Sequence, residues 1–115
     1  MMKFESLVPF LLVLLVSMAR NEAIAGGYHP IKNINDPYII GIAHFAITEY
    51  NKRGAGAKLE FMKVIKGELE FVQGINYRLI LSANDGSTSN NYEALVLDEP
   101  VKYSRNLISF KPLHA

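Results

Sequence analysis

One helical segment, followed only by strand-like runs, limits the folds open to this chain of 115 residues. Asp36 and Pro37 are typical of a helix start, because aspartate caps a first turn and proline fits it. Gly54, directly after two basic residues, is typical of a helix end. The apolar residues between these signals recur at helical spacing: Ile39, Ile40, Ala43, Ala46, Ile47 and Tyr50. Ile42 and Phe45 widen this face, so we expect the helix to be wrapped by other elements.

The rest of the chain predicts a sheet to do the wrapping. Strand-like runs cover residues 59–72, 76–83, 92–98 and 106–110, with a polar loop at 84–91 and a second connection at 99–104. The length of the first run, with Gly67 inside it, predicts a bend or bulge. We therefore predict an α+β fold, in which a four- to five-stranded antiparallel sheet wraps around one α-helix.

The order of the strands places two turns at one end of this sheet. The turn at Glu70–Gly74 and the turn at Pro100-Val101 are separated by two strands of a meander, so both lie at the same edge. We expect Gly74 to adopt a positive φ in a tight turn. Of Phe71 and Val72, we expect one to face the helix.

Residues 1–25 have the layout of a secretory signal peptide. Lys3 precedes an apolar run at residues 7–16, which is shorter than the ~20 residues a membrane-spanning helix needs. Cleavage is expected between Ala19 and Ala25, since Ser17-Met-Ala19 and Ala23-Ile-Ala25 both fit the small-x-small rule. The mature domain is then 26–115, in the secretory pathway, extracellular or vacuolar, with no membrane attachment after removal of the signal.

Composition argues against an enzyme and for a binding module. The chain contains no cysteine, and its net charge of +1 favours neither nucleic acid nor membranes as partners. His29, His44 and His114 share no metal-ligand spacing, so no metal or cofactor is expected. Glu68 and Glu70 share one strand face, but a solvated edge explains this pair better than acid–base catalysis does.

The segment ahead of the helix has no periodicity. Residues 26–36 are rich in Gly, Pro and Asn and indicate an extended, flexible arm. Gly26 and Gly27 would let this arm lie flat against a protein surface. The alternative is that these residues are a leader left over from secretion.

Several separated motifs within residues 26–113 resemble those of one family, the plant cystatins, which inhibit papain-like cysteine proteases. The glycine pair resembles the family's N-terminal trunk, and residues 42–47 with Asn51-Lys52 resemble its helix signature. Glu70–Gly74 falls where the family has Gln-x-Val-x-Gly, and Pro100-Val101 where it has Pro-Trp. Further matches are Leu59–Phe61, Val64-Ile65, Tyr77–Leu79, Asn84–Gly86, Asn91–Ala94 and Arg105–Leu107.

The resemblance implies a secreted, monomeric, reversible and competitive inhibitor of papain-like cysteine proteases. In the family, the trunk and two hairpin loops form a wedge that blocks the active-site cleft. The corresponding protease-binding residues here are Gly26, Gly27, Glu70, Phe71, Val72, Gln73, Gly74, Pro100 and Val101.

Two departures from the family pattern fall on this wedge. Glu70 replaces a glutamine, which adds a charge that is unfavourable if it is desolvated on binding. Val101 replaces a tryptophan, which removes roughly 100 Å² of apolar contact, or about 2.5 kcal/mol. Tyr103 could partly substitute. The alternative hypothesis is a cystatin-fold binding or structural protein whose inhibition is weak or lost.

Overall fold

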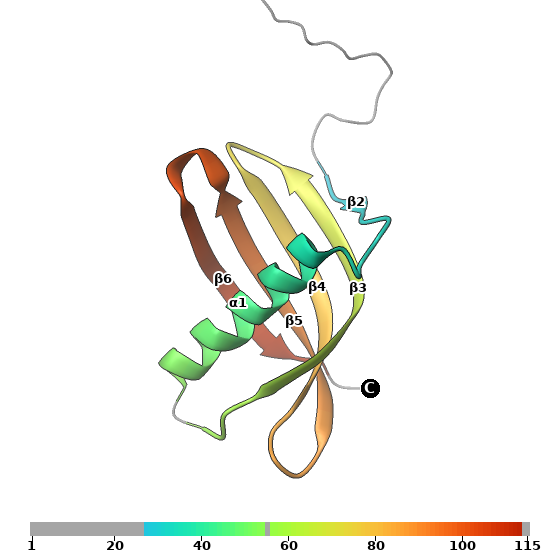
Figure 1. Ribbon diagram of the computed structural model, residues 1–115, viewed down its shortest axis with the longest axis vertical. Coiled ribbons are helices and arrows are strands. Elements are labelled where there is room, and N and C mark those ends of the chain that lie inside the picture. The colour runs from blue at the N-terminus through green and yellow to red at the C-terminus, as the bar shows by residue number, and fades with distance from the viewer. Residues whose placement is uncertain (1–26, 55, 114–115) are drawn as a thin grey trace, which may run out of the picture.

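A computed structural model describes residues 27–54 and 56–113, so the expected signal peptide and Gly26 lie outside the described residues. Five antiparallel strands form one sheet in the order β2-β3-β4-β5-β6, and α1, the one α-helix among the described residues, crosses one face of it (Figure 1). The elements are β2 His29–Pro30, α1 Pro37–Arg53, β3 Glu60–Phe71, β4 Ile75–Asn84, β5 Ser89–Glu99 and β6 Ser104–Pro112. The predicted fold class is confirmed.

Helix α1 begins and ends where its capping residues predict. The Asp36 carboxylate accepts a hydrogen bond from the backbone N–H of Tyr38 at 2.8 Å, and Gly54 donates its N–H to the carbonyl of Tyr50 at 2.8 Å. Both bonds satisfy backbone groups that a helix end otherwise leaves without partners. Within the described residues, no helix combines the length and apolar character needed to cross a bilayer.

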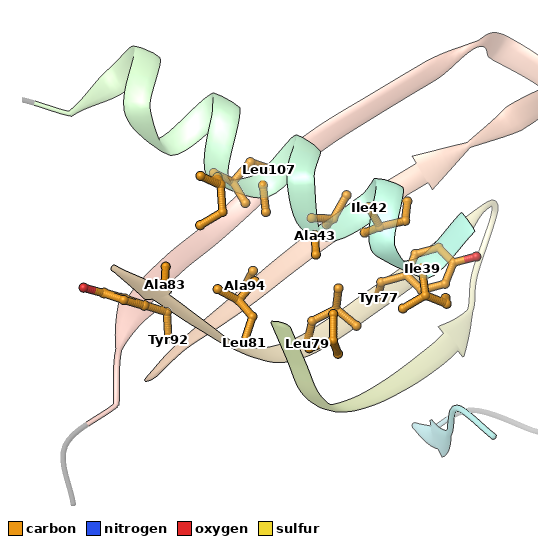
Figure 2. Packing of buried hydrophobic residues seen from close by; sticks show 14 of the residues in the cluster. Ile39, Ile42, Ala43, Tyr77, Leu79, Leu81, Ala83, Tyr92, Ala94 and Leu107 are labelled. Carbon is orange, nitrogen blue, oxygen red and sulfur yellow. The ribbon is translucent and has the colours of Figure 1, made fainter. Parts of the chain in front are cut away.

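The core lies between α1 and the concave face of the sheet (Figure 2). Every second residue of β4 faces the helix, so Tyr77, Leu79 and Leu81, which alternate along this strand, are buried. The largest fully buried side chains are Ile42, Leu79, Leu81 and Val96. Each contributes roughly 1.5–3 kcal/mol through apolar burial, which gives a chain without disulfides its main source of stability.

The connection between β4 and β5 is shorter than the predicted loop at 84–91. The sheet continues through Asn90 and Asn91, which pair with Ala83 and Ser82, because polar residues at an exposed strand end do not interrupt the ladder. Only residues 85–88 form the turn. Hydrogen bonds from the Thr88 and Ser87 backbone lower the pKa of the Asp85 carboxyl that closes it.

The predicted irregularity of β3 exists, but Gly67 does not cause it. The register shifts occur between Phe61 and Lys63 and between Val64 and Lys66, whereas Gly67 pairs regularly with Leu79. A Cβ atom at Gly67 would lie 2.9 Å from the Ile31 Cδ1 atom. The glycine therefore makes room for a side chain from the N-terminal arm.

Candidate functional site

The first hairpin turn projects beyond the start of the helix. It joins β3 to β4 through residues 72–74, closed by a 2.9 Å hydrogen bond from the Val72 N–H to the Gly74 carbonyl. The side chains of Phe71 and Val72 are 57% and 50% exposed, so the expectation that one faces the helix is wrong. The reason is that this hairpin extends past the first turn of α1 (Figure 1).

Gly74 is a glycine for a different reason from the one predicted. Its φ is not positive; the positive-φ glycines among the described residues are Gly27 and Gly86. Instead, a Cβ at Gly74 would lie 2.5 Å from the Asp98 carbonyl oxygen and 2.7 Å from Glu99 Cγ. Both atoms belong to β5, so the absence of a side chain lets the first hairpin lie against the strand that leads into the second.

The second hairpin turn displays two fully accessible side chains. It contains a short 3-10 helix, η2 Pro100–Lys102, followed by Tyr103 in the left-handed conformation with φ 51°. The Tyr103 N–H donates to the Pro100 carbonyl at 3.0 Å. Val101 is 94% exposed and Tyr103 is 99% exposed. A tyrosine at positive φ is strained, and such strain is found preferentially at functional positions.

The two turns lie side by side, as the meander topology predicts. Together they line a shallow pocket of about 460 Å³, formed by Gln73, Gly74, Glu99, Pro100, Val101 and Lys102. Of the nine predicted site residues, five thus belong to two adjacent turns at one end of the sheet, and two more, Glu70 and Phe71, end the strand that leads into the first turn. An eighth, Gly27, is tied to this end, because its N–H donates to the Glu70 carboxylate at 3.3 Å. The ninth, Gly26, lies outside the described residues.

The buried carboxylate of Asp98 lies at the base of the second hairpin. Asp98 is only 3% exposed and accepts hydrogen bonds from the Tyr38 hydroxyl and, at 3.0 Å, from Arg105 Nε. The bond to Asp98 raises the pKa of the Tyr38 hydroxyl above its ordinary value. This cluster was missed from the sequence. A signal was present, since Asp98 continues the buried alternation of Tyr92, Ala94 and Val96 along β5.

The residues weighed as enzyme candidates have other contacts. Glu68 pairs with Arg78 at 2.7 Å, and the ring of His44 packs on Phe61 at 4.5 Å. His29 lies in β2, and His114 is outside the described residues. Among residues 27–54 and 56–113, no group of three or more His, Cys, Asp or Glu is arranged to hold a metal ion.

Comparison with known proteins shows the family to which this chain belongs. Cysteine proteinase inhibitor 5 of Arabidopsis thaliana is 46% identical over 110 residues, which span 95% of this chain and 89% of that protein. The chain belongs to the plant cysteine proteinase inhibitors, the phytocystatins. A second phytocystatin, cysteine proteinase inhibitor 1 of Actinidia chinensis var. chinensis, is 42% identical over 92 residues, which span 80% of this chain and 78% of that protein. These relatives are inhibitors and not enzymes, in agreement with the sequence prediction.

Solved structures and a family profile also match this phytocystatin. The salivary cystatin of the soft tick Ornithodoros moubata has the same fold, with a TM-score of 0.68 and 18% identity over 77% of this chain and 98% of that one. The squash aspartic acid proteinase inhibitor has a TM-score of 0.60 and 28% identity over 76% of this chain and 94% of that one. A family profile described as "Aspartic acid proteinase inhibitor" matches residues 31–113.

Proposed function

We propose that this phytocystatin is a secreted, reversible and competitive inhibitor of papain-like cysteine proteases. The main support for this proposal is the exposed apolar surface of the two adjacent hairpins. At one end of the molecule they present the side chains of Phe71, Val72, Val101 and Tyr103. Apolar side chains that project from rigid turns favour insertion into a complementary cleft. The relatives, named as cysteine proteinase inhibitors, support a protease as the partner.

The chemistry of this edge is that of binding without a covalent step. The chain has no cysteine, and the contact residues offer apolar surface and backbone groups. A stable protein–protein interface buries about 800 Å² on each partner. The two turns and the N-terminal arm form an extended edge, which favours contact along the length of a protease cleft. Because no covalent bond forms, dissociation leaves both proteins unchanged. Secretion is supported by the signal-like residues 1–25, and we expect a monomer to act alone.

The direct test is to titrate papain with the mature protein. We expect inhibition that rises with inhibitor concentration and is relieved by excess substrate, which is the behaviour of competition for one site. The absence of inhibition at high micromolar concentration would contradict the proposal. It would favour the alternative of a cystatin-fold binding or structural protein that has lost inhibition, which is motivated by Glu70 in place of a glutamine and Val101 in place of a tryptophan.

A second candidate activity, inhibition of aspartic proteases, is favoured by the family profile and by the 28% identity to the squash inhibitor. Titration of pepsin alongside papain separates the two activities. Inhibition of papain alone supports the leading proposal, and inhibition of pepsin alone replaces it.

Val101→Trp is expected to strengthen papain inhibition by about ten- to one-hundredfold. Val101 projects from the turn with almost its whole surface exposed, so a larger side chain meets no steric obstacle within the protein. The added area of roughly 100 Å² is worth about 2.5 kcal/mol if it is fully buried on binding. Inhibition constants for both proteins check this. If inhibition arises only when Val101→Trp is combined with Glu70→Gln, the lost-inhibition alternative is correct.

Tyr103→Gly is expected to weaken papain inhibition by about tenfold, because an exposed aromatic anchor is removed. The same change should leave the free energy of unfolding unchanged or raise it by up to about 1 kcal/mol, since glycine accepts the left-handed backbone without strain. Tyr103→Trp, which keeps an aromatic ring, is the control. Unaltered inhibition by Tyr103→Gly would show that this ring does not contact the protease.

A further inference from the structure

The N-terminal arm is docked on the sheet, although its composition predicts a flexible segment. Strand β2 pairs with β3 through His29↔Leu69 and Pro30↔Glu68, and it forms the edge of the sheet beside β3 (Figure 1). This pairing is weak by itself. A two-residue strand forms few ladder hydrogen bonds, and Pro30 has no N–H to donate. Other contacts must therefore hold the arm in place.

One of these contacts is made by Tyr28. Its ring lies 4.0 Å from the Arg78 guanidinium carbon, a distance typical of a cation–π interaction. Arg78 is itself fixed, because its Nη2 and Nε atoms donate to one carboxylate oxygen of Glu68 at 2.7 and 3.1 Å. A guanidinium stays charged throughout the physiological pH range, so the cation under the ring is permanent, and the hydrogen bonds to Glu68 raise the pKa of Arg78 further. Arg78 alternates with the buried Tyr77 and Leu79, which places this contact on the sheet face opposite α1.

Contacts on either side of Tyr28 extend the docking. Ahead of it, Gly27 donates its N–H to the Glu70 carboxylate at 3.3 Å and adopts a φ of +85°, which glycine accepts readily. Beyond it, the Ile31 N–H donates to the Gly67 carbonyl at 2.9 Å, and the Ile31 side chain fills the space above that glycine. The segment of residues 27–31 thus lies along β3, and Tyr28 connects it to β4 through Arg78.

We propose that Gly27, Tyr28, Glu68, Glu70 and Arg78 form a latch that holds the trunk in its protease-binding position before the protease arrives. The latch rests on the function proposed above, and its members are positioning residues for the contact edge. A trunk that is already ordered loses less conformational entropy on binding, so affinity increases without a new contact. In this protein, the gain in affinity from an ordered trunk offsets part of the affinity lost by having Val101 where the family has tryptophan.

The latch also assigns a role to Glu70. Its carboxylate accepts from the trunk within the inhibitor and does not need to contact the protease. A glutamine side chain has the same shape and keeps an acceptor oxygen. Glu70→Gln should therefore leave papain inhibition within about twofold of the wild type, whereas Glu70→Ala should weaken it, because the Gly27 N–H loses its partner. A large improvement with Glu70→Gln would show that this carboxylate faces the protease, and would overturn this part of the latch.

The latch is tested in the free protein by amide exchange of the arm. Arg78→Ala, in the chain beginning at Gly26, is expected to accelerate exchange at the Ile31 N–H by about fivefold, the loss expected for a cation–π contact. Tyr28→Ala should have the same effect, and Tyr28→Phe, which keeps the ring, should restore protection. Lys52→Ala is the matched control, because Lys52 pairs with Glu49 at 3.2 Å within α1, on the opposite face of the sheet from Arg78. Unchanged exchange in Arg78→Ala would overturn the latch.

Inhibition kinetics then connect the latch to function. Arg78→Ala should weaken papain inhibition by about fivefold in the chain beginning at Gly26. In a chain beginning at His29, which lacks the trunk residues that Arg78 and Glu70 hold, the same substitution should have no effect. An equal effect in both chains would show that Arg78 acts through general stability and would overturn the positioning role. If the wild type does not inhibit papain, the proposed function fails, whereas the exchange experiment still decides the latch.

Discussion

Gly74→Ala is expected to lower the free energy of unfolding by about 3 kcal/mol and to weaken papain inhibition by at least 100-fold. The new Cβ would lie 2.5 Å from the Asp98 carbonyl oxygen, well inside van der Waals contact. No rotation of a side chain relieves a collision with a backbone atom. The first hairpin must therefore move away from β5, which separates the two turns that form the contact edge.

Gly41→Ala is the matched control for this substitution. Gly41 lies within α1, and a Cβ there would meet no atom within 4 Å. Alanine has the higher helix propensity, so this variant should be more stable by up to about 1 kcal/mol, with papain inhibition unchanged. Urea unfolding and inhibition constants measure both variants. If Gly74→Ala matches the wild type in both measurements, the close contact between the hairpins has no functional role.

Asp98→Ala is expected to lower the free energy of unfolding by about 3 kcal/mol, because it removes a buried carboxylate and leaves the half-buried Arg105 without its ion-pair partner. The Tyr38 hydroxyl loses its acceptor in the same step. Asp98 of β5 pairs with Arg105 of β6. The next pair, Glu99 and Ser104, directly flanks the second hairpin turn. Papain inhibition should therefore weaken as well, since the turn that carries Val101 and Tyr103 loses its support.

Glu93→Ala is the control for Asp98→Ala. Glu93 is also a β5 carboxylate that pairs with a cation on β6, but the Lys111 partner is largely exposed. Solvent-exposed pairs contribute only ~0–1 kcal/mol, so this variant should unfold close to the wild-type midpoint. Equal destabilisation by both substitutions would show that burial of Asp98 has no special importance.

The sequence predicts those parts of the fold that local rules determine. The cap at Asp36, the stop at Gly54 and the alternation of Tyr77, Leu79 and Leu81 are each encoded within a few residues. The shared edge of the two turns follows from the number of strands between them. The length of the β4–β5 loop was overestimated, because a polar residue such as Asn90 continues a ladder when its partner strand is present.

The remaining features depend on contacts between distant segments, which local patterns do not reveal. Gly74 is constrained by Asp98, and Gly67 by Ile31, so neither requirement is visible in the neighbouring residues. The arm at 27–31 has the composition of a flexible segment, but it contacts Arg78 and Glu70, which lie about 40 to 50 residues further along the chain. The exposure of both Phe71 and Val72 depends on where the helix starts relative to the hairpin.

Protection of the catalytic cysteine of papain shows whether the inhibitor occupies the active-site cleft. Papain is treated with iodoacetamide in the presence of increasing amounts of the mature protein, and alkylation of that cysteine is followed over time. If the edge formed by the trunk and the two hairpins occupies the cleft, alkylation slows in proportion to the fraction of papain bound, and dilution restores both reactivity and activity. Alkylation at the full rate in an inhibited complex would show that the cleft stays open, and would contradict the account.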